Sequence, residues 1–140
     1  MIKLHVVAFQ QGVKKIFWYN YKDHESEREY AENYFGLVDY NGYPKPVYLA
    51  YIHLYSLLKG KQAVGMRTIG EDIQVYTFES QKERTSVIWT RSGKNRKLSV
   101  KAFDVDHEIS KITDAIGKPE APLDGFVEVS EMPIFFTSRK

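Results

Sequence analysis

Hydrophobic residues recur at helical spacing near the start of the chain. Ile2, Val6 and Phe9 fall on one face when the chain is wound with about 3.6 residues per turn, and Gly12 follows where a helix would end. We therefore predict a short helix that stops before Gly12.

A second apolar stripe lies between residues 46 and 60. Pro46 suits the first turn of a helix, and Lys59 and Gly60 place a cation and a glycine at its end. The stripe itself recurs every third or fourth residue, at Val47, Tyr51, Leu54 and Leu58. This pattern predicts a helix from about residue 47 to residue 58, preceded by a turn at Asn41-Gly42.

An unbroken apolar run separates the two predicted helices. Ile16–Tyr19 lies inside the stretch Val13–Tyr21, whereas Lys22–Glu32 is almost entirely polar. The apolar run is typical of a strand covered on both faces. The polar stretch is typical of an exposed loop or a short surface helix. Such a strand needs a hydrogen-bonding neighbour on each side, and the first sixty residues offer none. It joins the sheet of the second half, pairs with another chain, or belongs to a larger protein.

From about residue 61 the hydrophobic period changes to two. Short alternating stretches are separated by turns rich in Gly, Lys, Asn and Ser, and no helical pattern lies between them. We predict strands at residues 73–78, 85–90, 97–103, 109–113, 125–129 and 134–137. The expected fold is mostly β: an antiparallel β-sandwich over residues 61–140, preceded by a helix–strand–helix segment over residues 1–60.

Composition narrows the functional classes. Twenty basic residues nearly balance eighteen acidic ones, and the basic stretch Arg91–Lys97 reads as a solvated hairpin tip, so we expect no nucleic-acid partner. No apolar run approaches the roughly 20 residues that cross a bilayer, and the N-terminus is a poor signal peptide. We expect no membrane association and, by default, a cytoplasmic location. Aromatic residues make up 14% of the chain, which suits both core packing and sugar stacking.

Candidate metal and cofactor sites are weak. The chain has no cysteine, and its four histidines share no ligand spacing. The acidic run Asp104–Glu108 lacks the glycine and final glutamate of a calcium loop, so a solvated turn is the favoured interpretation. We expect neither a metal nor a cofactor.

Several motifs together resemble the end of a clan A glycoside hydrolase. Residues 11–23, QGVKKIFWYNYKD, look like the eighth strand of the TIM barrel in those enzymes. The segments FGLVD (35–39) and GYPKPVYLAY (42–51) resemble the approach to the eighth helix. The fragments VYTF (75–78), VIWT (87–90), TDAIG (113–117) and MPIF (132–135) resemble the small β-sandwich that follows the barrel in several of these families.

This resemblance implies that most of the barrel, with both catalytic glutamates, would lie upstream of Met1. It also implies three substrate-binding candidates near the end of the last strand. Trp18 would form the floor beneath the sugar, Asn20 would share its facing and bind a hydroxyl, and Asp23 would follow in the loop. Tyr19 would point the other way, into the helix layer.

Four functions remain open at this stage. The first is a C-terminal portion of a glycoside hydrolase-like protein, structural in role and inactive alone. The second is a free-standing carbohydrate-binding module. The third is a chain whose role is association, since Val13–Tyr21 invites pairing with a second copy or with an upstream polypeptide. The fourth, an intact small enzyme using carboxylates such as Asp39 and Asp114, lacks a supporting constellation.

Overall fold

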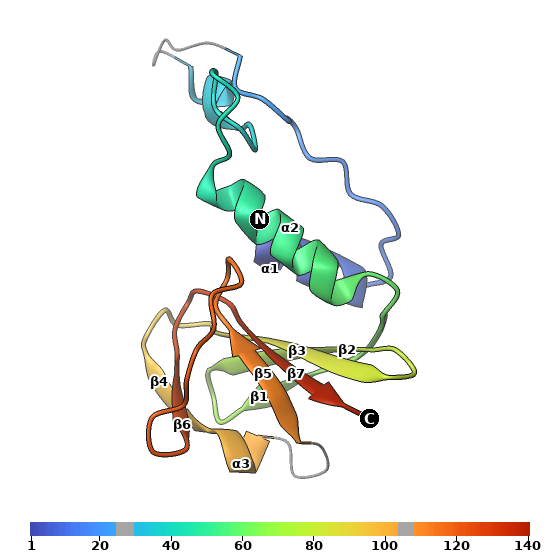
Figure 1. Ribbon diagram of the computed structural model, residues 1–140, viewed down its shortest axis with the longest axis vertical. Coiled ribbons are helices and arrows are strands. Elements are labelled where there is room, and N and C mark those ends of the chain that lie inside the picture. The colour runs from blue at the N-terminus through green and yellow to red at the C-terminus, as the bar shows by residue number, and fades with distance from the viewer. Residues whose placement is uncertain (25–29, 104–107) are drawn as a thin grey trace.

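The computed structural model describes residues 1–24, 30–103 and 108–140 (Figure 1). It contains two main helices, α1 (Ile2–Gln10) and α2 (Pro46–Leu58), a short 3-10 turn, η1 (Ala31–Tyr34), and a single helical turn, α3 (Val100–Phe103). The strands are β1 (Gln62–Ile69), β2 (Ile73–Glu79), β3 (Glu83–Thr90), β4 (Arg96–Ser99), β5 (Ile109–Thr113), β6 (Phe126–Val129) and β7 (Ile134–Arg139).

The strands form two antiparallel sheets. The larger has the order β1-β2-β3-β7-β5, and the smaller pairs β4 with β6. In Figure 1, α1 and α2 lie together over the larger sheet. The predicted mostly-β fold with an antiparallel sandwich is confirmed, and so are both predicted helices.

Two hydrophobic clusters lie on opposite faces of the larger sheet. The first joins α1 and α2 to the sheet through residues that include Val6, Leu54, Tyr76, Trp89 and Phe135. The second joins the smaller sheet and α3 to the other face and includes Val75, Ile88, Val129, Phe103 and Phe136. Neighbouring positions of a strand face opposite ways, so β2 and β3 contribute to both clusters. The division of the chain after residue 60 stays a prediction.

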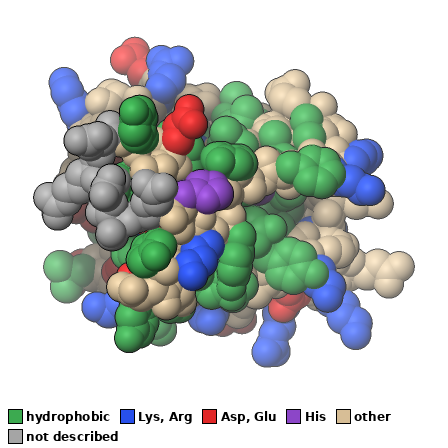
Figure 2. All heavy atoms as spheres, turned by 90° about the horizontal axis from the view of Figure 1, so that it is seen from above, with side chains coloured by type: hydrophobic (Ala, Val, Ile, Leu, Met, Phe, Trp, Pro, Cys, Tyr) green, Lys and Arg blue, Asp and Glu red, His purple; other side chains and the backbone are tan. Residues whose placement is uncertain are grey.

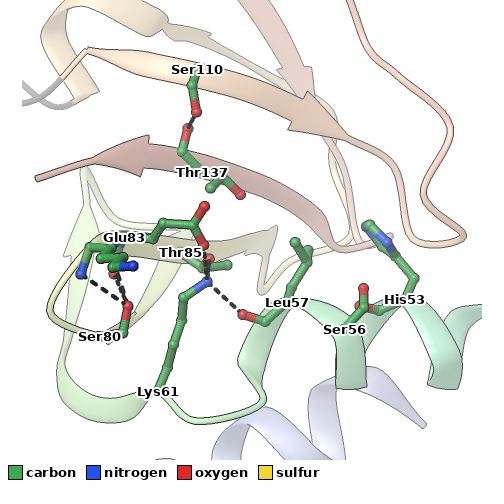
Figure 3. A network of polar contacts seen from close by, with 10 residues as sticks. His53, Ser56, Leu57, Lys61, Ser80, Glu83, Thr85, Ser110 and Thr137 are labelled. Carbon is green, nitrogen blue, oxygen red and sulfur yellow. Dashed lines mark hydrogen bonds and ion pairs between the residues drawn. The ribbon is translucent and has the colours of Figure 1, made fainter.

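Polar contacts fix α2 against the sheet at two points, and Figure 3 shows the one at Lys61. Near the middle of the helix, His53 Nε2 lies 2.8 Å from Thr113 Oγ1 of β5. Just beyond the helix, Lys61 Nζ donates to the Leu57 carbonyl oxygen at 2.7 Å and to Thr85 Oγ1 of β3 at 2.9 Å. The Lys61 side chain is only 5% exposed, so its ammonium satisfies groups that water scarcely reaches.

The strand predicted over residues 97–103 ends earlier than expected. Residues 96–99 form β4, but Val100–Phe103 turn into α3. The turn carries the Phe103 ring to within 4.8 Å of the Phe136 ring centroid, edge to face, inside the second cluster. Packing of this one ring outweighs the alternating pattern of the sequence.

Residues 91–95 are not a hairpin tip, because the strands on either side belong to different sheets. Asp72 holds this crossover: its Oδ1 accepts from Ser92 N at 2.7 Å, and its Oδ2 accepts from Ser92 Oγ at 2.6 Å and from Arg96 Nε at 3.2 Å. The Ser92 hydrogen bonds, reinforced by Arg96, hold the pKa of Asp72 below its ordinary value.

The predicted strand at Val13–Tyr21 belongs to neither sheet. Figure 1 shows it as an extended stretch at the periphery, leading away from α1. None of the described strands lies alongside it. The sequence had indicated this, because the first sixty residues offered no neighbouring strand.

Candidate functional site

The residues after Val13–Tyr21 are joined to the segment that leads into α2. Val38 N donates to the Tyr21 carbonyl oxygen at 3.0 Å, and Asp23 N donates to the Val38 carbonyl oxygen at 3.1 Å. These bonds form an isolated parallel bridge between Lys22 and Val38. The bridge places the three predicted site residues next to segments more than ten positions away in the chain.

Asp23 is the most firmly held of the three. Its Oδ1 accepts from Gly36 N at 2.8 Å, and its two oxygens lie 2.9 and 3.0 Å from Lys45 Nζ. Lys45 Nζ also donates to the Tyr34 carbonyl oxygen at 2.8 Å. The Asp23 side chain is 5% exposed and that of Lys45 is 25% exposed, so the pair is partly buried. The carboxylate serves contacts within the chain, and its role in sugar binding stays a prediction.

Trp18 faces α1. Its Nε1 donates to the Phe35 carbonyl oxygen at 3.1 Å, and its ring centroid lies 6.1 Å from that of His5. Tyr19 points away from the helices, is 62% exposed and places its hydroxyl 3.0 Å from His24 Nε2. The orientation predicted for Tyr19 is therefore wrong, because α1 covers one side of the segment and Trp18 occupies that side.

Asn20 carries polar capacity that the chain does not use. Its side-chain oxygen and nitrogen are both buried, and neither has a hydrogen-bond partner among the described residues. Its backbone oxygen accepts from Leu37 N at 3.2 Å, which fixes the residue in place. A buried amide without partners is uncommon in folded proteins, and this one can offer an acceptor and two donors.

A groove of about 810 Å³ is lined in part by residues 12–17 of the extended segment. Its lining includes His5 and Phe9 of α1, Ile16, and Tyr51 and Leu58 of α2. None of Trp18, Asn20 and Asp23 lines it. The structure thus places Asn20 and Asp23 beside the Lys22–Val38 bridge, and it places Trp18 against Phe35. It does not bring the three residues into a common groove.

His5 lines this groove and was not singled out from the sequence. Its ring lies 6.1 Å from the Phe9 centroid and 5.7 Å from that of Tyr51, and the residue is 3% exposed. Burial lowers the pKa of His5, which keeps the ring neutral at pH 7. Its helical spacing from Phe9 was the only sequence signal, and that signal does not separate a core histidine from a functional one.

Lys45 and Gly36 were also missed as partners of Asp23. A Cβ on Gly36 would lie 2.5 Å from Asp23 Oδ1, so only glycine allows the carboxylate to approach this backbone. A cation between two prolines, as in Pro44-Lys45-Pro46, was the available signal, because its backbone position is restricted on both sides.

Exposed aromatic side chains gather in the first part of the chain. Among the described residues, the large exposed aromatics up to residue 55 are Phe17, Tyr19, Tyr21, Tyr30, Tyr34, Phe35, Tyr40, Tyr43 and Tyr55, and only Phe126 follows later. Figure 2 shows hydrophobic side chains spread over the face seen from above. Tyr76 and Trp89 of the sandwich are instead buried and stacked, with centroids 4.6 Å apart.

Within residues 1–24, 30–103 and 108–140, no group of three or more His, Cys, Asp or Glu side chains is placed to hold a metal ion. Most of the acidic run Asp104–Glu108 lies outside the described residues. None of the helices in the described part of the chain is both long enough and apolar enough to span a bilayer.

Comparisons with known proteins give a match of fold. No protein-family model matches the chain, and no curated protein does. A solved structure of a family 39 glycoside hydrolase from the gut symbiont Bacteroides cellulosilyticus WH2 matches 98% of this chain with a TM-score of 0.75 and 21% sequence identity. The chain spans 29% of that enzyme's length.

A second match, to Eubacterium rectale Amy13B, has a TM-score of 0.41 and 11% identity over 64% of this chain and 18% of the other, and it carries no argument. The match to the family 39 enzyme confirms, at the level of the fold, the resemblance to the end of a clan A glycoside hydrolase.

Proposed function

We propose that this chain is the C-terminal portion of a glycoside hydrolase-like protein. In the proposal, Val13–Tyr21 is the last strand of a barrel, and the two β-sheets buttress that barrel from outside. The observation that carries the proposal is the match of nearly the whole chain to less than a third of a family 39 glycoside hydrolase. The strand-like segment without neighbours and the exposed aromatics around it agree with a surface that another part of the protein covers.

The proposal includes one wall of a sugar pocket. Trp18 offers a flat ring for stacking, and Asn20 offers an amide that no described residue engages. Asp23 would have a positioning role. Its carboxylate binds Gly36 N and Lys45 Nζ and so holds the loop beside Asn20 in place.

Catalysis would come from carboxylates outside this chain. Retaining glycosidases need two carboxyl groups about 5 Å apart, one to protonate the leaving oxygen and one to attack the sugar. The carboxylates nearest to the recognisable motifs serve local structure here. Asp23 binds Lys45, Asp39 accepts from Tyr43 N at 2.8 Å, and Asp114 accepts from Ile116 N at 3.0 Å. We therefore propose that the chain is inactive alone.

Two measurements test this function. The chain alone is expected to hydrolyse no aryl glycoside and to give no heat with a panel of oligosaccharides in calorimetry. Addition of the polypeptide encoded directly upstream is expected to restore hydrolysis. Trp18→Ala is then expected to lower kcat/KM by at least about tenfold, whereas Phe126→Ala, which removes an exposed aromatic of the sandwich, leaves it unchanged. Hydrolysis by the chain alone would refute the proposal.

The same calorimetry addresses the alternative of a free-standing carbohydrate-binding module. Tyr76 and Trp89, two aromatics of the sandwich strands, lie in the core at 9% and 6% exposure. The sandwich thus lacks their rings as a platform. Micromolar binding of an oligosaccharide by the chain alone would favour the module.

A further inference from the structure

Six consecutive peptide units of the extended segment have no backbone partner. Val13 N donates to the Ala8 carbonyl oxygen at 3.0 Å, and the Asn20 carbonyl oxygen accepts from Leu37 N. Between them, the N–H and C=O groups of residues 14–19 make no hydrogen bond to the backbone of any described residue. This stretch has the length of an ordinary strand and the hydrogen-bonding groups of a free sheet edge.

From Lys15 to Tyr19 the exposure of the side chains alternates as in a strand. Phe17 and Tyr19 are 91% and 62% exposed, whereas Ile16 and Trp18 are half-buried. The residue types are the β-branched and aromatic ones that favour strands. The stretch from Lys15 to Tyr19 therefore presents an unpaired backbone together with exposed aromatic rings.

We propose that this edge pairs with the same segment of a second copy of the chain, antiparallel and centred on Phe17. In this register Phe17 lies opposite its own symmetry mate, and Lys15 lies opposite Tyr19. Phe17 and Tyr19 thereby gain cross-strand neighbours, and an aromatic pair such as Phe17 with its mate stabilises an antiparallel ladder. A two-fold symmetric pair of identical surfaces is also the commonest form of association between copies of one chain.

The charges of the segment favour this direction of pairing. Lys14 and Lys15 are the only charged residues between Val13 and Tyr21. A parallel ladder would set these cations beside their own copies, which is unfavourable. The antiparallel register places the two lysines of one copy and those of the other at opposite ends of the ladder.

Self-pairing does not rest on the proposed glycoside hydrolase relationship, since it follows from unpaired backbone and side-chain pattern alone. It uses the same edge that an upstream barrel polypeptide would occupy. The two forms of association therefore exclude one another at residues 14–19, and their tests give different results.

The first test is light scattering coupled to size-exclusion chromatography over a dilution series, combined with amide hydrogen exchange. We expect twice the mass of one chain at high concentration, with slowed exchange of the residue 14–19 amides, and loss of both on dilution. Phe17→Pro, which removes one N–H of the edge, is expected to give one-chain mass at every concentration. Ala121→Pro, in an exposed loop, is the matched proline control and is expected to leave the pair intact.

Phe17→Ala keeps the backbone donor and is expected to weaken the pair severalfold without abolishing it. Circular dichroism establishes that each variant keeps its fold. One-chain mass throughout, an open series of larger masses, or a pair whose residue 14–19 amides still exchange freely would each overturn the proposal. Protection of these amides only in a complex with the upstream polypeptide would also overturn it, while supporting the proposed function.

Discussion

The ammonium of Lys45 lies 2.9 and 3.0 Å from the two carboxylate oxygens of Asp23. Lys45 is the residue immediately before α2, and Asp23 belongs to the bridge that follows the extended segment. The pair therefore ties the start of α2 to the region that holds Trp18 and Asn20. The geometry of the candidate site depends on a contact between residues 22 positions apart.

Removal of the carboxylate is expected to destabilise this region. Asp23→Ala leaves Lys45 without its counter-charge and Gly36 N without an acceptor, at a cost of about 1–3 kcal/mol in the free energy of unfolding. Urea denaturation measures the loss, and Glu32→Gln, at an exposed carboxylate in the same region, is the control. An unchanged midpoint for Asp23→Ala would show that the pair contributes nothing to stability.

A single methyl group at Gly36 is expected to disturb the same contact. Its Cβ would lie 2.5 Å from Asp23 Oδ1 and 2.7 Å from the Lys22 carbonyl carbon, so backbone must move. We expect Gly36→Ala to lower the free energy of unfolding by about 1–3 kcal/mol. At Gly65 of β1 an added Cβ meets nothing within 4 Å, so Gly65→Ala should lie close to the wild type. Equal effects of the two substitutions in thermal denaturation would contradict the argument.

Substitutions of Lys61 and Lys59 compare a buried ammonium with an exposed one. Lys61→Met removes the ammonium that serves Leu57, Glu83 and Thr85, and we expect a loss of about 1–3 kcal/mol, because the Thr85 side chain is fully buried. Lys59→Met removes only an exposed cation 5.5 Å from the Tyr55 ring centroid, which is worth at most about 1 kcal/mol. Chemical denaturation of both variants should rank Lys61→Met as the less stable, and the reverse order would refute the role given to Lys61.

The histidine that joins α2 to β5 makes stability depend on pH. Burial lowers the pKa of His53, nearby Lys111 lowers it further, and Asp114 opposes the shift. As pH falls below the ordinary histidine pKa of about 6.5, the unfolded chain takes up the proton first, so stability is complete above that pH and declines below it.

Urea midpoints between neutral pH and mildly acidic pH measure this decline. His53→Gln is expected to show a smaller decline than the wild type, while His5, whose pKa is lowered in the same direction, keeps part of it. Identical pH profiles for the two proteins would exclude His53 as a source.

The helices could be predicted from the sequence because each buries one face, as Val6 and Leu54 do against the sheet. β1 could not be identified as a separate strand, since it lies at an edge and most of its side chains are exposed, which leaves no alternating pattern. Residues 100–103 were misassigned because the position of Phe103 depends on Phe136, which lies far along the chain.

The candidate site shows the same limit. Alternation predicted that Trp18 and Asn20 share a facing, and both are half-buried. The alternation could not tell which side the helix covers, so Tyr19 was assigned the wrong direction. The partners of Asp23 lie at positions 36 and 45, and only the folded chain brings them together.

The position of the larger sheet between two cores gives neighbouring residues different surroundings. Val87 and Ile88 are adjacent in β3 and both fully buried, yet Val87 lies in the cluster under α1 and α2, and Ile88 lies in the cluster under the smaller sheet. Methyl resonances at these two positions would therefore report separately on the two layers. The extended segment follows α1, whose buried residues pack in the cluster of Val87 and not in that of Ile88, although a single peptide bond separates the two residues.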